Sequence, residues 1–130
     1  MKTILVTGGA GFIGSNFVRR LYENHKDSKI IVLDALTYAG RLENIPANIR
    51  ADQKRFEFVF GNVCNGVLVD SLVGRSDIVV HFAAESHVAR SIFDNKIFFE
   101  TDVLGTQAVS TAVVKNYRTV ERFIHISTSE

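Results

Sequence analysis

The segment that most constrains the fold of this chain is a glycine-rich stretch over residues 7–14, which reads Thr-Gly-Gly-Ala-Gly-Phe-Ile-Gly. It follows a run of β-branched residues and leucine over Lys2–Thr7, and such a run predicts a buried strand. The next residues, Phe12–Asn24, have the spacing of an amphipathic helix. The apolar residues expected on one side of that helix are Phe12, Ile13, Phe17, Val18 and Leu21. A strand, a tight turn and a helix in this order are typical of α/β folds.

Strand and helix patterns alternate along the rest of the chain. Further strands are predicted at Lys29–Leu33, Phe56–Phe60, Asp77–Phe82 and Arg122–Ser127, and helices at Val67–Val73 and Lys96–Asn116. The stretch Arg41–Asp52 is predicted to be irregular, with one short helical turn before Pro46. Alternation requires crossover connections, so the strands are expected to pair in parallel with helices on both faces. The predicted fold class is therefore α/β, a Rossmann-type doubly wound parallel sheet truncated after about the fifth strand, with residues 1–130 forming one incomplete domain.

The glycines have the spacing of a phosphate-binding turn. Gly9, Gly11 and Gly14 form Gly-x-Gly-x-x-Gly, and Gly8 in place of Gly9 gives Gly-x-x-Gly-x-x-Gly. Asp34 follows twenty residues after Gly14, at the end of the next predicted strand. A glycine turn between strand and helix with an acid at this distance is the signature of a dinucleotide site, in which a pyrophosphate binds main-chain N–H groups at the helix start.

The acid also bears on which dinucleotide binds. The Asp34 carboxylate can accept hydrogen bonds from both hydroxyls of an adenosine ribose, and it would repel a 2′-phosphate. NAD is therefore predicted as the cofactor. NADP remains the alternative, because the nearby basic residue Arg41 can reach a phosphate.

Composition limits the other partners. The chain carries 15 basic and 14 acidic residues for a net charge of +1, which gives no electrostatic case for nucleic acid or a membrane surface. The single cysteine, Cys64, excludes an internal disulfide and favours a reducing, cytoplasmic location. The histidines lack metal-ligand spacing, so no metal site is predicted, and His81 is interpreted as a buried structural residue. The chain ends directly after a strand pattern, which predicts that it is a fragment of a longer protein.

The glycine spacing, with Thr7 before it, resembles the extended short-chain dehydrogenase/reductase family. Within its nucleotide-sugar branch, two segments are similar to those of dTDP-glucose 4,6-dehydratases: residues 34–40, Asp-Ala-Leu-Thr-Tyr-Ala-Gly, and residues 81–91, His-Phe-Ala-Ala-Glu-Ser-His-Val-Ala-Arg-Ser. The resemblance implies a lyase that uses NAD on a nucleotide-linked sugar, dTDP-glucose foremost, through a 4-keto intermediate. It also implies a homodimer built on the long helix 96–116.

The resemblance assigns roles by matching position. Those implied for the cofactor are Gly8, Gly11, Phe12, Ile13, Gly14, Asp34, Leu36, Thr37, Gly40, Asn62, Val63, Phe82, Ala83, Ala84 and Thr101. Those implied for the substrate are Glu85, Ser86 and His87, and those for catalysis are Thr128, Ser129 and Glu130. Thr128 is expected to hydrogen-bond the sugar C4 hydroxyl, and Glu130 is the candidate base at C5.

Three positions depart from the dehydratase pattern, because Asn62, Ala89 and Ser129 stand where aspartate is usual. A serine is not a proton donor of carboxylic strength, so an epimerase or a decarboxylase of the same family remains an alternative reading. A non-catalytic NAD-binding module is another, because the family's Tyr-x-x-x-Lys pair is not found in a suitable place. Tyr22 and Lys26 have its spacing, but they lie at the end of the first predicted helix, far from the expected place of the nicotinamide, and are interpreted as a surface coincidence.

Overall fold

A computed structural model describes residues 1–36, 40–82 and 103–127 of the chain. In this part, five strands form one sheet in the order β3-β2-β1-β4-β5, and every neighbouring pair is parallel. The strands are β1 (Lys2–Thr7), β2 (Ser28–Asp34), β3 (Phe56–Phe60), β4 (Ile78–His81) and β5 (Arg122–His125). The predicted parallel, doubly wound sheet is confirmed.

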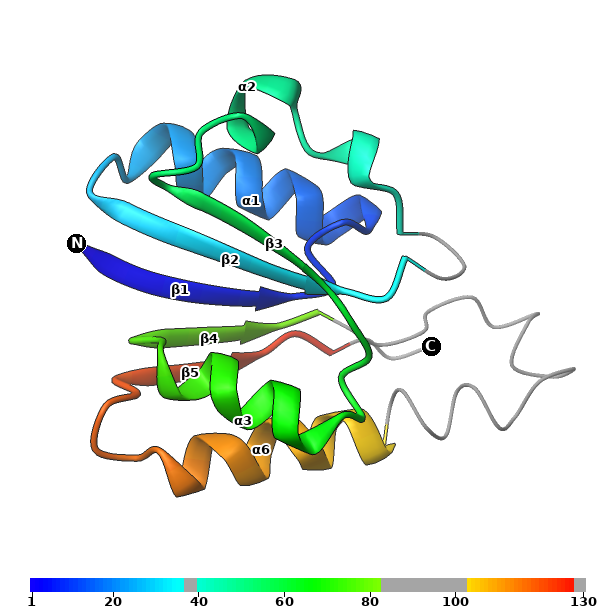
Figure 1. Cartoon of the computed structure of the whole chain (residues 1–130), viewed down its shortest axis with the longest axis vertical. Helices are drawn as coiled ribbons and strands as arrows, with labels where there is room; N and C mark the ends of the chain where they lie inside the picture. The colour runs from blue at the N-terminus through cyan, green and yellow to red at the C-terminus, as the bar shows by residue number, and fades with distance from the viewer. Residues whose placement is uncertain (37–39, 83–102, 128–130) are drawn as a thin grey trace, which may run out of the picture.

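Helices cover both faces of the sheet (Figure 1). One face carries α1 (Phe12–Asn24), the 3-10 turn η1 (Leu42–Asn44) and α2 (Ala47–Arg50). The other carries α3 (Gly66–Gly74) and α6 (Thr106–Lys115). Right-handed crossovers between parallel strands produce this two-sided arrangement. None of the described helices is both long and apolar enough to cross a bilayer.

The strands at the centre are buried on both sides, and alternate residues serve the two faces. In β1, Ile4 and Val6 belong to the core under α1, while Leu5 belongs to the core under α3 and α6. Leu5 and Val6 are both fully buried, and burying a side chain of this kind contributes roughly 1.5–3 kcal/mol. The continuous apolar run of this strand therefore reflects a sheet with no solvent-facing side.

All five strands bring their carboxyl ends to one edge of the sheet. Thr7 is in register with His81 of β4, and His81 with His125 of β5. On the other side, Asp34 of β2 is in register with Phe60 of β3. The chain moves outward in opposite directions from β1 and β4, so the space beyond these two strands is the switch point at which α/β folds bind ligands.

Several boundaries differ from the sequence-based predictions. β5 ends at His125 rather than Ser127, and α2 forms just after Pro46 where irregular structure was expected. The buried Ile49 anchors α2 in the core, a tertiary contact that the local sequence does not reveal. Of the predicted helix 96–116, residues 96–102 lie outside the described part of the chain.

The first turn of α1 also corrects a prediction. Phe12 and Ile13 are 79% and 64% exposed, so they do not share the buried side of the helix. That side is formed by Gly14, Ser15 and Val18. Because Gly14 lies directly against the glycine turn, it fixes the rotation of the helix and leaves the two large apolar residues facing outward.

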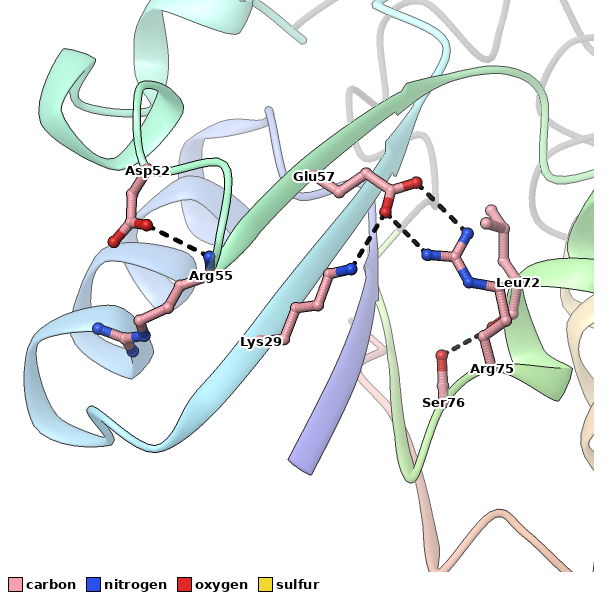
Figure 2. Close-up of polar contacts among 7 residues, drawn as sticks. All are labelled: Lys29, Asp52, Arg55, Glu57, Leu72, Arg75 and Ser76. Atoms are coloured by element: carbon pink, nitrogen blue, oxygen red, sulfur yellow. Dashed lines mark hydrogen bonds and ion pairs between the residues drawn. The ribbon is translucent and has the colours of Figure 1, made fainter. Parts of the chain in front are cut away.

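Ion pairs hold the edge strand β3 in place, toward the amino ends of the strands (Figure 2). Glu57 of β3 pairs with Lys29 of β2 at 3.5 Å and with Arg75, which follows α3, at 2.8 Å. The hydrogen bond from the Arg75 guanidinium lowers the pKa of the Glu57 carboxyl below its usual value. These contacts tie sheet and helix together at the end remote from the glycine turn.

Arg55 closes the C-terminus of α1 at that same remote end. Its guanidinium donates to the carbonyls of Tyr22 at 3.1 Å and His25 at 2.8 Å, and it lies 4.2 Å from the centre of the Tyr22 ring. The Tyr22 hydroxyl donates to Asp52 at 2.7 Å, which raises the pKa of Tyr22. Tyr22 thus has a structural role at this end of α1. This role agrees with the interpretation of Tyr22 and Lys26 as a coincidental match to the Tyr-x-x-x-Lys spacing.

Candidate nucleotide-binding site

The turn between β1 and α1 depends on glycine at three positions. A Cβ atom at Gly9 would lie 2.8 Å from Cγ1 of the fully buried Val32. Gly8 has a φ of 73°, a left-handed conformation in which side chains are strained. At Gly14 a Cβ atom would lie 2.2 Å from the carbonyl oxygen of Gly8, an overlap between backbone atoms. Gly11 differs, because a Cβ atom there would meet only the Gly8 oxygen at 3.4 Å, an ordinary contact. The fold itself therefore requires Gly8, Gly9 and Gly14, but it leaves room at Gly11.

The turn leaves the start of α1 open. The first N–H groups of a helix have no acceptor within that helix, and they carry the positive end of its dipole. Gly11 occupies the N-cap position, and among the described residues no side chain caps the helix through a hydrogen bond. The first turn holds no acidic residue either. This helix end is therefore suited to an anion with several oxygen atoms.

Asp34 joins the end of β2 to the glycine turn. Its Oδ2 accepts the N–H of Ala10 at 2.9 Å, and its Oδ1 accepts the N–H of Leu36 at 2.8 Å. The second bond supports a left-handed backbone at Leu36, where φ is 53°. Gly40 packs against the same carboxylate, since a Cβ there would lie 2.7 Å from Oδ1. A carboxylate oxygen can accept more than one hydrogen bond, so Asp34 retains capacity for ribose hydroxyls.

Two predicted adenine contacts follow β3, and they differ in role. Asn62 is exposed, and its Oδ1 accepts the N–H of Cys64 at 2.8 Å. The side chain of Val63 is buried in the core beneath α3, which leaves only its backbone for a ligand. The next turn ends at Asn65, whose Oδ1 accepts the N–H of Leu68 at 3.2 Å and so caps α3.

The end of β4 is bound tightly to the end of β1. Phe82 donates its N–H to the carbonyl of Thr7 at 2.8 Å, and its ring centre lies 5.4 Å from that of Phe17 on α1. His81 is fully buried, with Nδ1 2.6 Å from the Thr7 hydroxyl and Nε2 3.1 Å from the Thr106 hydroxyl. Burial, reinforced by neighbouring His125, lowers the pKa of His81 to about 4. His81 is thus neutral at pH 7, and its interpretation as a buried structural histidine is confirmed.

The structure therefore gathers the predicted glycines, Asp34, Leu36, Gly40, Asn62 and Phe82 around the carboxyl edge of the sheet. Ten predicted site residues lie outside the described part of the chain: Thr37, Ala83, Ala84, Glu85, Ser86, His87, Thr101, Thr128, Ser129 and Glu130. Sequence reasoning missed Asn44, which donates from Nδ2 to the carbonyl of Ala10 in the glycine turn at 2.8 Å. No local signal marks it, because a polar residue in an irregular stretch has no distinctive pattern.

Fold and site together define a Rossmann-type α/β domain with a phosphate-binding glycine turn at its switch point. A family model described as GDP-mannose 4,6 dehydratase matches residues 5–130. The chain belongs to this family, a nucleotide-sugar branch of the extended short-chain dehydrogenases/reductases.

Similar proteins agree with this placement. The chain is 49% identical over 127 residues to the low-salt glycan biosynthesis protein Agl12 of Haloferax volcanii, covering 98% of this chain and 39% of that protein. It is 46% identical over 132 residues to a dTDP-glucose 4,6-dehydratase of Streptomyces antibioticus, covering 98% and 37% respectively. The chain thus spans less than two-fifths of the length of these relatives.

Solved structures share the same fold. A double mutant of DesIV, a dTDP-glucose 4,6-dehydratase from Streptomyces venezuelae with NAD bound, superposes with a TM-score of 0.87 at 46% identity, covering 96% of this chain and 39% of that one. A UDP-glucose 4-epimerase from Thermotoga maritima superposes with a TM-score of 0.81 at 31% identity, covering 97% and 38%. Dehydratases and epimerases therefore share this architecture.

Proposed function

We propose that this chain is the NAD-binding part of a nucleotide-sugar 4,6-dehydratase of the dTDP-glucose type. The observation that carries the proposal is the pairing of an open, uncapped α1 N-terminus with Asp34 at the same edge of the sheet. The open terminus suits a diphosphate, and the carboxylate suits the hydroxyls of the adjoining ribose. Together they match the two most polar parts of a dinucleotide.

The residues present fit NAD both at its diphosphate and at its adenosine. The room left at Gly11 allows the backbone to approach a diphosphate closely, and the exposed Phe12 and Ile13 lie at the mouth of the turn. Asp34 would receive the adenosine ribose and disfavour a 2′-phosphate. Asn62 would meet the adenine through its second lone pair, because Cys64 uses only one. Bound NAD supplies a hydride acceptor.

The remaining chemistry is assigned to residues outside the described part of the chain. We assign Thr128 to orienting the C4 hydroxyl of the hexose, and Glu85, Ser86 and His87 to holding the substrate. Once C4 is oxidised, the C5 proton becomes acidic. Glu130 would take that proton, and the C6 hydroxyl would leave as water with a proton from solvent, because Ser129 in the position of the usual acid is not a donor of carboxylic strength. The hydride removed from C4 would return to C6, so that the net change is the loss of one water. Relatives of 42–46% identity named dTDP-glucose 4,6-dehydratase support this choice of reaction.

An epimerase is the second candidate, and two observations support it. Ser129 stands where the dehydratases have aspartate, and the match to a UDP-glucose 4-epimerase structure has a TM-score of 0.81. The reaction is tested on the full-length gene product with dTDP-glucose, with products separated by chromatography and identified by mass spectrometry. A product lighter by one water supports the dehydratase, whereas an isomer of unchanged mass supports the epimerase.

We also assign a cytoplasmic location and a homodimer built on the helix that contains α6. Val114 of α6 is 72% exposed, while Val109 is fully buried, so α6 has a core side and carries a large apolar residue on its outward side. Light scattering of the full-length gene product at micromolar concentration tests the assembly. A mass of one chain at all concentrations would contradict it.

NAD binding is tested by titration calorimetry on the chain and on Asp34→Asn. The substitution keeps the size of the side chain but replaces one acceptor oxygen with a donor and removes the charge. We expect NAD affinity to fall on the order of 10-fold, the loss typical of a hydrogen bond to a charged group. The ratio of NADP to NAD affinity should rise, because the repelling carboxylate is gone.

Asp27→Asn is the matched control, since Asp27 is exposed and the change in charge is the same. It should leave NAD affinity unchanged. Absence of NAD binding by the folded unsubstituted chain would refute the proposed cofactor.

A further inference from the structure

Ala10 lies at the centre of the glycine turn, and its backbone is held from outside the turn. The residue is fully buried. Its N–H donates to Asp34 Oδ2 at 2.9 Å. Its carbonyl oxygen accepts two hydrogen bonds, from the N–H of Arg41 at 3.1 Å and from Nδ2 of Asn44 at 2.8 Å. The last residue of β2 and the segment after it therefore hold both peptide groups of Ala10 by hydrogen bonds.

These hydrogen bonds fix the direction of the peptide that leads into α1. The carbonyl of Ala10 and the N–H of Gly11 belong to one planar unit and point in opposite directions. The Gly11 N–H donates to the Gly8 carbonyl at 3.2 Å, and the Gly11 carbonyl accepts the N–H of Ser15 at 2.9 Å as α1 begins. Rotation of the Ala10–Gly11 peptide would break the bond from the Gly11 N–H to the Gly8 carbonyl and the two bonds to the Ala10 carbonyl. It would also turn the Ala10 carbonyl oxygen toward the Gly8 carbonyl oxygen, so the turn that leads into the open start of α1 could not keep its shape.

The local structure around Asn44 holds this residue in position to donate to the Ala10 carbonyl. It is the last residue of η1, and its N–H donates to the carbonyl of Arg41 at 3.0 Å. The next residue, Ile45, is fully buried in the core under α1 and donates to Leu42 at 3.0 Å. Asn44 itself is exposed, so its side chain adds little to the core. Its described hydrogen bond through the side chain is the one to Ala10.

We propose that Asn44 is a positioning residue for the diphosphate of the dinucleotide. It acts through Ala10, by keeping the Ala10–Gly11 peptide hydrogen-bonded within the turn, so that the first N–H groups of α1 stay in place for the ligand. This inference rests on the proposed function as an NAD-binding chain. It adds that diphosphate affinity depends on Asn44 as well as on Asp34, although Asn44 lies thirty residues after Gly14 in the chain.

The experiment compares a ligand that has the diphosphate with one that lacks it. ADP-ribose carries the diphosphate and adenosine does not, and both contain the ribose assigned to Asp34. Affinities for both are measured on the chain, on Asn44→Ala and on Asn44→Asp, by calorimetry for ADP-ribose and by ligand-observed NMR for adenosine. Thermal melts of each variant accompany the titrations.

We expect ADP-ribose affinity to fall about 3-fold in Asn44→Ala, which removes one of two donors to the Ala10 carbonyl. In Asn44→Asp the fall should be about 20-fold, because a carboxylate oxygen then faces that carbonyl. Adenosine affinity should stay within about 2-fold in both variants, within the scatter of a neutral change. Asn48→Asp adds the same charge on α2, at an exposed position, and should leave both affinities unchanged.

Three other outcomes would contradict this inference. If adenosine and ADP-ribose weaken equally, Asn44 supports the fold in general and has no specific part in diphosphate binding. Should both Asn44 variants bind ADP-ribose as the unsubstituted chain does, this inference fails while the proposed function stands. If the unsubstituted chain binds neither NAD nor ADP-ribose, the proposed function and this inference fail together. Asn44→Ala keeps the test decisive even where the charged variant does not fold.

Discussion

The turn after β1 and the turn after β3 both lead from the carboxyl edge of the sheet into a helix, yet they leave that helix in different states. The helix after β3 is closed by its own chain, because Asn65 caps α3 through the N–H of Leu68 at 3.2 Å. The helix after β1 starts behind Gly11, which has no side chain to serve as a cap. The same edge of the sheet therefore carries one capped and one uncapped helix start.

The difference indicates what each turn is built to do. A capped helix start gains on the order of 1 kcal/mol in stability from the cap. The β1–α1 turn has glycine at this position, which costs only a few tenths of a kcal/mol relative to a side-chain cap, and its backbone geometry is set by Asp34 and Asn44. An open helix start held this firmly is a preorganised anion site, whereas the start of α3 is a structural junction.

The largest expected effect contrasts the glycines of the two helices. Gly14→Ala should destabilise the chain by on the order of 4 kcal/mol, since its Cβ would lie 2.2 Å from the Gly8 carbonyl oxygen. Gly66→Ala is the matched change at the start of α3, where no described atom lies within 4 Å of the new Cβ. It should be neutral or stabilise by up to about 1 kcal/mol. Urea unfolding followed by circular dichroism measures both.

Equal destabilisation by the two alanine substitutions would show that close packing does not distinguish the two turns.

The same contrast explains why the sequence was informative at this turn. The role of Gly14 follows from spacing alone, because strand, turn and helix are consecutive in the chain. The alternation of elements likewise predicted the sheet and its parallel pairing, since each element is encoded by its own periodicity.

Other features were beyond sequence reasoning because they arise only when distant segments meet. The exposure of Phe12 and Ile13 follows from the close approach of Gly14 to Gly8, which sets the rotation of α1. The contact of Asn44 with Ala10 joins residues 34 apart in the chain, and nothing in either local segment announces it. Asp34 was predicted as a ribose ligand, while its structural bond to Ala10 was not.

The next effect comes from converting the open turn to the closed kind. Gly11 has φ −75° and ψ 178°, the extended conformation of an N-cap residue, and its Cβ position has room. Gly11→Asp should therefore cap α1 and stabilise the chain by about 0.5–1 kcal/mol, through the cap and the helix dipole. The same carboxylate would occupy and repel the diphosphate position, so NAD affinity should fall about 100-fold.

Asn65→Ala is the reciprocal change at α3. Loss of its cap should cost about 1 kcal/mol of stability without altering NAD affinity. Stability and affinity should thus move in opposite directions at Gly11, and only stability should move at Asn65. A Gly11→Asp variant that is more stable and still binds NAD normally would contradict the assignment of the open helix end to the diphosphate.

The last of these effects concerns how the two turns respond to acid. The open turn begins at Thr7, whose hydroxyl lies 2.6 Å from Nδ1 of the buried His81, while the capped turn begins after the exposed Phe60. The pKa of His81 is lowered to about 4 in the fold, against about 6.5 in an unfolded chain. Between these values the unfolded state binds more protons, so stability is lost as pH falls through this window.

From pH 7 to pH 5 the loss due to His81 should be about 2 kcal/mol, measured by urea unfolding at each pH. His81→Gln keeps a group able to hydrogen-bond Thr7 but does not titrate, so its stability should change less over the same range. His25→Gln, at an exposed histidine, should follow the unsubstituted chain. Glu57 does not affect this comparison. Because Arg75 lowers the pKa of Glu57, the stability that this carboxylate contributes is lost only below the ordinary glutamate pKa, under pH 5. If His81→Gln and the unsubstituted chain lose equal stability by pH 5, the buried histidine does not make the open turn sensitive to acid.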